Sequence, residues 1–116
     1  MQTNMVGSGP LASLPPWQRA SERFEVDVVA TLQIASHFVA GQVKDLSEGG
    51  VCVLGTSFAL EVGEALALAF PLDGELVMAR GTVRWVRGSK TGIEFSHIAP
   101  FDRQMIAAFC KKLAAK

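Results

Sequence analysis

The segment from Phe24 to Ile34, "FEVDVVATLQI", alternates apolar and polar residues with a period of two. Such alternation is typical of a β-strand with one buried and one exposed face. Five more segments of strand-like character follow along the chain: "HFVAGQVKDL", "GVCVLG", "EALALAFPL", "ELVMARGTVRWVRG" and "TGIEFSHI". The pattern therefore predicts six β-strands.

Glycine and proline indicate how these strands are joined and bent. Asp73-Gly74 and Gly88-Ser89 favour tight hairpin turns. Gly81 lies inside the fifth segment and indicates a bend or a β-bulge. Pro71 has no N–H to donate to a neighbouring strand, so we expect it at the edge or the end of the sheet.

The last segment, "PFDRQMIAAFCKKLAAK", changes to helical spacing. Its apolar residues recur every three or four positions: Met105, Ile106, Phe109 and Leu113. Pro100 suits the first helical position and Asp102 the positive end of the helix dipole, and lysines gather at the other end. We expect a six-stranded antiparallel β-barrel with a C-terminal α-helix, because closure removes the exposed edges of a small sheet.

Residues 1–18 contain three of the five prolines and show no hydrophobic period. We interpret this segment as a flexible N-terminal arm, and its "MVGSGP" has the character of residues added for expression. Residues 19–116 then form a single domain, which a chain of 116 residues allows.

Composition and charge limit the possible functions. The formal net charge is zero, which argues against DNA, RNA or acidic membranes as partners. No apolar run approaches the ~20 residues of a membrane span. Cys52 and Cys110 lie in apolar stretches and fit a reducing, cytoplasmic location as buried side chains. His37 and His97 are isolated, so we expect no metal site, and no nucleophile–base pair suggests an enzyme.

Two polar clusters stand out against this background. The first is "RASER", in which Arg19 and Arg23 can present forked guanidinium groups to phosphates or to the O6/N7 edge of guanine. The second is "DLSEGG", in which Asp45 and Ser47 are expected to share a strand face while Leu46 points into the core. Each cluster alone is more often an ordinary feature, a solvated basic pair or a turn.

The glycines of the second cluster, Gly49 and Gly50, allow positive φ and a close approach of a ligand to the backbone. A carboxylate such as Asp45 can accept hydrogen bonds from the N1–H and N2–H₂ edge of guanine, and a hydroxyl can donate to a phosphate or a base.

Together, the R-x-x-x-R and D-x-S-x-x-G motifs resemble those of the PilZ domain family, in the same order and at a suitable separation. The later "GTVRWVRGSKTGIEF" is similar to the late hairpin of that family, and the resemblance covers roughly residues 17–115. It implies a six-stranded barrel with a C-terminal helix that acts as a bacterial receptor for cyclic di-GMP. It also implies that Arg19, Arg23, Asp45, Ser47 and Gly50 contact this ligand.

The chain departs from the family pattern at Gln18, where many relatives have a further arginine. The resemblance therefore favours one ligand per domain rather than a stacked pair. Trp85 lies where some relatives place an aromatic residue against a guanine, although a core or barrel-capping position is the more ordinary explanation. Gln18, Gly49 and Trp85 are thus additional candidates for ligand contact.

The resemblance further implies a regulator of motility or biofilm formation that acts on a downstream protein partner. We expect ligand binding to order the N-terminal arm and so to change the partner contacts. Two alternatives remain open: a PilZ-like protein-interaction module that acts without nucleotide, and a small barrel for single-stranded nucleic acid.

Overall fold

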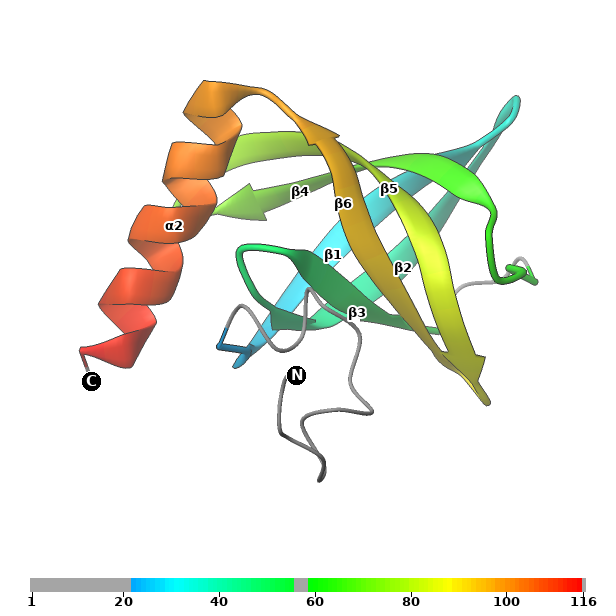
Figure 1. Ribbon diagram of the computed structural model, residues 1–116, viewed down its shortest axis with the longest axis horizontal. Helices are drawn as coiled ribbons and strands as arrows, with labels where there is room; N and C mark the ends of the chain where they lie inside the picture. Colours follow the sequence, from blue (N-terminus) through cyan, green and yellow to red (C-terminus); the bar gives the residue numbers. More distant parts are fainter. Residues whose placement is uncertain (1–21, 56–58, 116) are drawn as a thin grey trace, which may run out of the picture.

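The computed structural model describes residues 22–55 and 59–115 (Figure 1). Six β-strands are followed by one α-helix. They are β1 (Phe24–Ile34), β2 (His37–Leu46), β3 (Gly50–Leu54), β4 (Ala65–Leu72), β5 (Glu75–Arg87), β6 (Lys90–Ile98) and α2 (Pro100–Ala114). The six predicted strands and the C-terminal helix are confirmed. The predicted arm over residues 1–18 lies outside the described residues, so the domain boundary after residue 18 stays a prediction.

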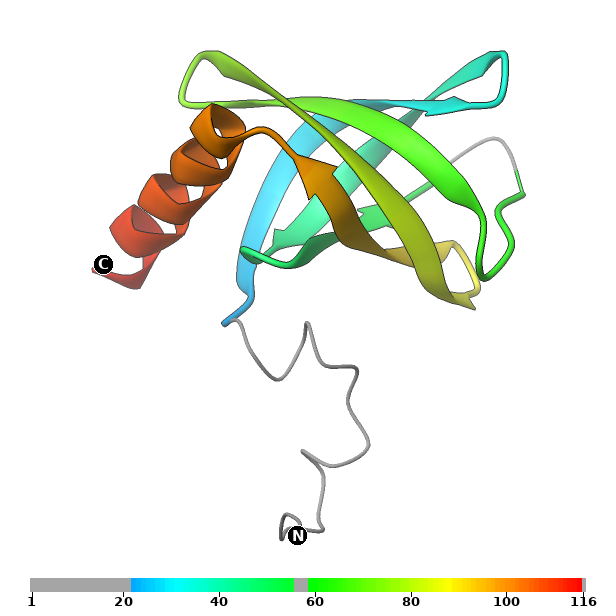
Figure 2. The same ribbon diagram turned by 45° about the horizontal axis from the view of Figure 1, so that its top comes forward.

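All neighbouring strands are antiparallel, and their order β1-β2-β3-β6-β5-β4 closes into a barrel because β1 also pairs with β4. Figure 2 shows the barrel with α2 packed beside one of its ends. Closure leaves no unpaired edge strand, which is how a small β-domain avoids edge-to-edge association. The predicted barrel is therefore confirmed.

The turns follow the chemistry of their residues. Asp73 and Gly74 both have positive φ, of 50° and 82°, as a type I′ hairpin requires. Gly88 has a φ of 60° at the tip of the β5–β6 hairpin. Pro71 lies near the end of β4, beyond the last residue that pairs with β1, where a missing N–H removes no ladder bond on that side.

The barrel interior is filled by one apolar cluster from all six strands and the helix. Phe70, Val43, Val53, Val77, Val83 and Ile93 are among its fully buried members. From α2, Ile106 and Cys110 are buried against the barrel, while Met105 and Phe109 pack at the margin. The helical spacing seen in the sequence is thus the spacing of the face that covers the barrel end.

Capping of α2 depends on backbone and charge more than on side-chain hydrogen bonds. Its N-cap is Ala99, which makes no side-chain cap, but Pro100 begins the helix and Asp102 lies in the first turn. In the last turn, Lys112 forms an ion pair with Asp73 of the β4–β5 hairpin, with Nζ and Oδ2 2.8 Å apart. Within the described residues, no helix is long and apolar enough to cross a membrane.

Two irregularities in strand register determine which side chains face outward. In β2, Val43 pairs with Val53 of β3 and Asp45 pairs with Cys52. Val53 and Cys52 are adjacent, but Val43 and Asp45 are separated by Lys44, so Lys44 is an extra residue in β2. In β5, Val83 pairs with Ile93 and Trp85 with Gly92, so Arg84 is extra. One extra residue reverses the alternation of every residue beyond it.

The consequence is that Lys44 and Asp45 both lie on the outside of the barrel, and so do Arg84 and Trp85. Under strict alternation from the buried residues Val43 and Val83, Asp45 and Trp85 would point into the core. A third shift in register occurs between Arg80 and Gly81, where the sequence predicted a bend or bulge. An added Cβ at Gly81 would lie 2.8 Å from the backbone oxygen of Glu94, so only glycine fits there without a shift.

Candidate functional site

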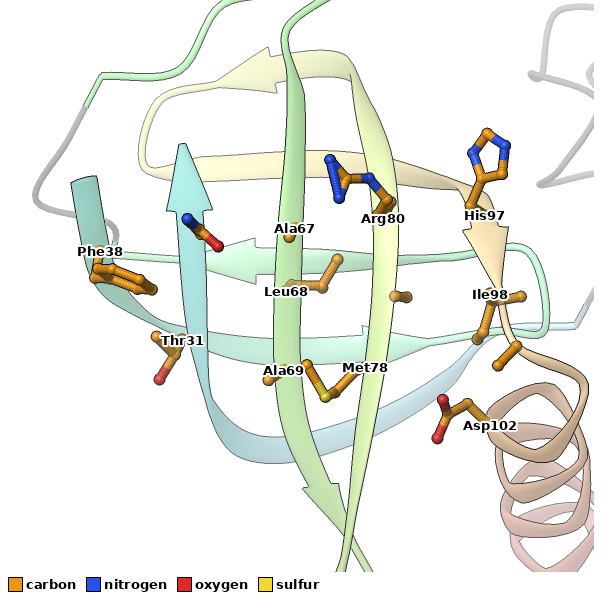
Figure 3. Close-up of a pocket in the computed structure, with 13 residues that line it drawn as sticks. Thr31, Phe38, Ala67, Leu68, Ala69, Met78, Arg80, His97, Ile98 and Asp102 are labelled. Atoms are coloured by element: carbon orange, nitrogen blue, oxygen red, sulfur yellow. The ribbon is translucent and has the colours of Figure 1, made fainter. Parts of the chain in front are cut away.

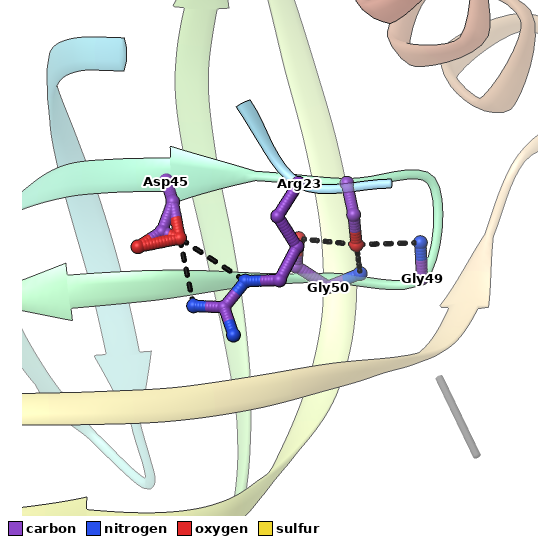
Figure 4. Close-up of polar contacts among 5 residues, drawn as sticks. Arg23, Asp45, Gly49 and Gly50 are labelled. Carbon is purple, nitrogen blue, oxygen red and sulfur yellow. Dashed lines mark hydrogen bonds and ion pairs between the residues drawn. The ribbon is translucent and has the colours of Figure 1, made fainter. Parts of the chain in front are cut away.

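The two sequence motifs meet on the outside of the barrel through one ion pair. The Arg23 guanidinium donates from Nε and Nη2 to Oδ1 of Asp45, over 3.2 and 2.7 Å (Figure 4). Both side chains remain partly accessible, with 32% and 26% of their surface exposed. A basic residue just before β1 and an acidic residue near the end of β2 therefore form one accessible pair.

The turn after β2 is built around Ser47. Its Oγ accepts hydrogen bonds from the N–H groups of Gly49 and Gly50, over 3.2 and 3.1 Å, and the Ser47 N–H donates to the Gly50 carbonyl over 2.9 Å. The N–H of Phe95 in β6 donates to the Gly49 carbonyl, over 2.8 Å, and attaches the turn to the barrel. The hydroxyl of Ser47 therefore shapes the backbone of the motif.

This arrangement differs from the sequence expectation in two respects. Ser47 is fully buried, whereas a strand extending through it would have placed it outside beside Asp45. The strand ends at Leu46, which is buried as expected. Neither Gly49 nor Gly50 adopts positive φ, because the bonds to the Ser47 hydroxyl close the turn in another conformation.

A row of outward residues extends from this pair across five strands. Register places Glu25, Asp45, Cys52, Gly92 and Trp85 side by side, from β1 through β2, β3 and β6 to β5. We use the name polar face for the surface formed by Arg23, Asp45, Cys52, Gly92, Trp85, Arg87 and Lys90. It combines cations, an acceptor and an aromatic ring.

Cys52 forms the floor of the polar face. It is only 3% exposed, yet it is absent from the core cluster to which its neighbours Val51 and Val53 belong. Burial raises the pKa of the Cys52 thiol and the charge of Asp45 raises it further, while Arg23 and Lys90 act in the opposite direction. The thiol is therefore protonated at neutral pH and lies close to all three charged groups.

Trp85 lies flat against Gly92. A Cβ added to Gly92 would come within 2.1 Å of indole atoms Cε2 and Nε1, so the ring occupies the space that any side chain there would need. The Arg87 guanidinium carbon is 5.3 Å from the centre of an indole ring, within cation–π distance. Trp85 is half-buried on the outer surface, which decides against the core position that the sequence left open.

Further charged residues border the Arg23–Asp45 pair. A hollow of about 610 Å³ opens beside Asp45 and Lys90, within the range of small-molecule sites. Lys44 and Asp27 also line it and form an ion pair, with Nζ and Oδ1 3.4 Å apart. No group of three or more histidine, cysteine, aspartate or glutamate residues that could hold a metal ion occurs among residues 22–55 and 59–115.

The predicted site residues thus have three outcomes in the structure. Arg23 and Asp45 are in contact, and Ser47, Gly49 and Gly50 form the adjoining turn. Trp85 lies on the same face, two strands beyond Cys52. Gln18 and Arg19 lie outside the described residues.

Sequence reasoning missed Cys52, Gly92, Arg87 and Lys90 as members of this face. The glycine in "TGIEF" opposite an aromatic residue was the available signal for Gly92, but it required the register between β5 and β6. Arg87 and Lys90 pair directly across the hairpin tip. Their contribution depends on the barrel bringing that hairpin next to β3.

The chain is similar in fold to several solved structures. The inhibitor of motility MotI/DgrA from Bacillus subtilis matches with a TM-score of 0.73 and 20% identity over 85% of this chain. The chain spans about half of that protein, 52% of its length. No curated protein sequence matches.

Two isolated PilZ domains match over most of their own length. The PilZ domain of YcgR from Escherichia coli, solved with c-di-GMP, matches with a TM-score of 0.68 and 14% identity over 84% of this chain and 92% of that domain. The PilZ domain of CeSA from a cellulose-synthesizing bacterium matches with a TM-score of 0.66 and 18% identity over 81% and 99%. At these identities the similarity establishes the fold.

The sequence itself matches the model of one family, described as the PilZ domain, over residues 18–112. This match covers both motifs, the barrel and most of α2. The chain therefore belongs to the PilZ domain family, a family of non-catalytic receptor modules for cyclic di-GMP.

Proposed function

We propose that this chain binds cyclic di-GMP on its polar face and acts as a cytoplasmic second-messenger receptor. The observation that carries the proposal is the contact between Arg23 and Asp45, which joins the arginine motif to the D-x-S-x-x-G motif on an accessible surface. Solved relatives support the choice of ligand, since the YcgR domain was solved with c-di-GMP and so was PlzA from Borreliella burgdorferi. Two free cysteines fit a reducing compartment.

The groups on this face have the chemistry that a cyclic purine dinucleotide requires. Arg23, with Arg19 from the preceding segment, supplies forked donors for phosphate oxygens and for the O6/N7 edge of guanine. Asp45 accepts from the N1–H and N2–H₂ edge of the base, and its present bond to Arg23 holds it on the outside of the barrel. Trp85 offers a flat apolar surface on which a base can stack.

Ser47, Gly49 and Gly50 have a supporting part in this proposal. Because the Ser47 hydroxyl is bonded to the turn backbone, it positions the backbone beside Asp45 while the glycines leave room for the ligand. Gln18, in place of an arginine, favours one ligand per domain. Charged hydrogen bonds contribute about 1.5–3 kcal/mol each, so a few of them suffice for micromolar affinity, about −8 kcal/mol.

The proposed mechanism of signalling is a change in the segment before Glu22. Binding brings Arg19 onto the polar face and orders residues 1–18 against the barrel, which creates a surface for a downstream protein partner. The fold-level similarity to an inhibitor of motility supports motility or biofilm regulation as the output. Amide exchange of residues 10–23 should slow when cyclic di-GMP is added, and unchanged exchange would contradict this mechanism.

Calorimetric titration tests the proposed ligand directly. We expect cyclic di-GMP to bind with a stoichiometry near one, while an unrelated dinucleotide and a short single-stranded oligonucleotide should not bind. Absence of heat with all three ligands would favour a protein-interaction module that acts without nucleotide. Binding of the oligonucleotide alone would indicate a nucleic-acid barrel instead.

A further inference from the structure

The outer surface of the barrel carries an apolar area made of β1, β2, β4 and β5. We use the name apolar face for Val29, Phe38, Ala67, Ala69, Leu76 and Met78. Four of these side chains are large and are 60–68% exposed: Val29, Phe38, Leu76 and Met78. Thr31 and Gln33 of β1 lie between Phe38 and the alanines of β4. Large exposed apolar side chains gathered on one side of a soluble protein mark interaction sites.

The composition of β4 is the strongest sign that this surface is covered by a protein. Its inward residues are leucine and phenylalanine, as the core requires, but its outward residues are Ala65, Ala67, Ala69 and Pro71. An antiparallel strand with one face in water normally alternates apolar with polar residues. Both faces of β4 are apolar, although the outward residues are partly or fully exposed.

The small side chains of β4 leave a groove. It has a volume of about 640 Å³ and crosses the strands from Phe38 to the first turn of α2, with Ala67 and Ala69 in its floor and Met78 beside them (Figure 3). Register confirms the alignment, since Gln33, Ala67, Arg80 and His97 follow one another across β1, β4, β5 and β6.

Opposite charges border the groove. Arg80 extends from β5 and Asp102 from the first turn of α2, and Figure 3 shows Asp102 beside the helix and Arg80 on the side of the groove near Ala67 and His97. Among residues 22–55 and 59–115, neither side chain has an ion-pair or hydrogen-bond partner, although both line the same hollow. The surface therefore combines an apolar centre with one cation and one anion that have no described partner.

We propose that the apolar face is the interface of a homodimer. In a two-fold symmetric interface each contact occurs twice, so Arg80 of each copy can pair with Asp102 of the other while the apolar centres cover one another. The formal net charge of zero leaves no overall repulsion between copies. Because the barrel has no free edge, two copies associate through sheet faces rather than by joining strands.

The area that a homodimer interface needs is a small part of the surface of this protein. A stable interface buries about 800 Å² per partner, and the whole described surface is 6680 Å². About an eighth of the surface is therefore required. The polar face lies on the outer side of β3 and β6, so a dimer of this kind leaves both proposed ligand sites open, and the inference is independent of the proposed function.

Sedimentation equilibrium of the 116-residue chain over a wide range of concentrations tests the dimer. We expect the mass to rise from 12.4 kDa toward twice that value as concentration increases. Met78→Glu should weaken association by about thirtyfold or more, since it places a charge in the apolar centre. Val62→Glu is the matched control, because Val62 is equally exposed, at 65%, and lies outside the apolar face.

Exchange of the two charges tests the symmetric pairing. Arg80→Asp and Asp102→Arg should each weaken association, and the double variant should restore it. Circular dichroism should show folded protein in every case, since both positions are accessible. The proposal would be overturned if the chain stays at 12.4 kDa at the highest concentration, or if Met78→Glu leaves the dimer affinity unchanged. Either result would indicate that the apolar face binds a different protein.

Discussion

The polar face and the apolar face are two outer surfaces of one barrel, and they are built in opposite ways. On the polar face, charged and aromatic side chains are held by specific contacts, such as the Arg23–Asp45 pair and the indole of Trp85 against Gly92. On the apolar face, Phe38, Leu76 and Met78 are 60–68% exposed beside the small alanines of β4.

The difference shows how a closed barrel can separate two kinds of binding. The core requires only the inward half of each strand, so the outward half is available for function. Charged and hydrogen-bonding groups suit a small charged ligand, because the strength of a hydrogen bond depends on the position and the chemical type of both partners. A broad apolar surface suits a protein, because burial of area is not directional.

The largest expected effect concerns the turn that shapes the polar face. Ser47→Ala removes the acceptor for the N–H groups of Gly49 and Gly50 and leaves buried donors unsatisfied. We expect it to lower the free energy of unfolding by about 2 kcal/mol. Urea denaturation measures this value. Ser96→Ala, at an exposed hydroxyl in β6, should change it by less than about 0.5 kcal/mol.

The next effect separates the two faces through their arginines. Arg23→Ala should weaken cyclic di-GMP binding at least about tenfold, since it removes charged hydrogen bonds, without unfolding the barrel. Arg80→Ala, on the border of the apolar face, should leave the affinity unchanged. Calorimetric titration of both variants decides the matter. Equal losses for the two variants would mean that charge alone, rather than position on the polar face, determines binding.

A comparable contrast concerns two aromatic residues of the outer surface, Trp85 and Phe38. Trp85→Ala should weaken cyclic di-GMP binding about fivefold, near the lower end of the 1–3 kcal/mol that stacking of a base on an aromatic ring contributes. Phe38→Ala should have no effect on ligand affinity. Quenching of tryptophan fluorescence during titration would provide a second measurement. Unchanged affinity in Trp85→Ala would remove the ring from the proposed site.

The smallest effect uses the thiol beneath the polar face. The raised pKa of Cys52 means that little thiolate exists at pH 7, so alkylation should be slow and should accelerate as pH rises toward 9 and above. Bound cyclic di-GMP should slow this reaction a few-fold by covering the face. Cys110, whose pKa burial raises to about 11, is the internal control that the ligand should not protect. Mass spectrometry resolves the two sites.

Much of the fold could be predicted from the sequence because its local signals agree. The alternation in β1, the turn pairs Asp73-Gly74 and Gly88-Ser89, and the helical spacing of α2 each depend on neighbouring residues alone. The register shift at Gly81 was also predicted, since a glycine within a strand pattern indicates a bend or a bulge. These features needed no knowledge of distant contacts.

The candidate site could be predicted only in part. The motifs brought together Arg23, Asp45 and the turn at Ser47, but the orientation of Ser47 was not predicted, because its hydroxyl is bonded to backbone groups of a turn that begins after the strand. Cys52 and Lys90 could not be placed near Asp45 without the pairing of β2 with β3 and of β3 with β6.

The sequence by itself determined which segments form strands, where they turn and which motifs the chain carries, since periodicity and turn chemistry are local properties. Only the tertiary structure decided that Trp85 faces outward, as Asp45 was already expected to do, because the extra residue at Arg84 reverses the alternation only once β5 and β6 are paired. Closure of the barrel then placed both side chains on one face.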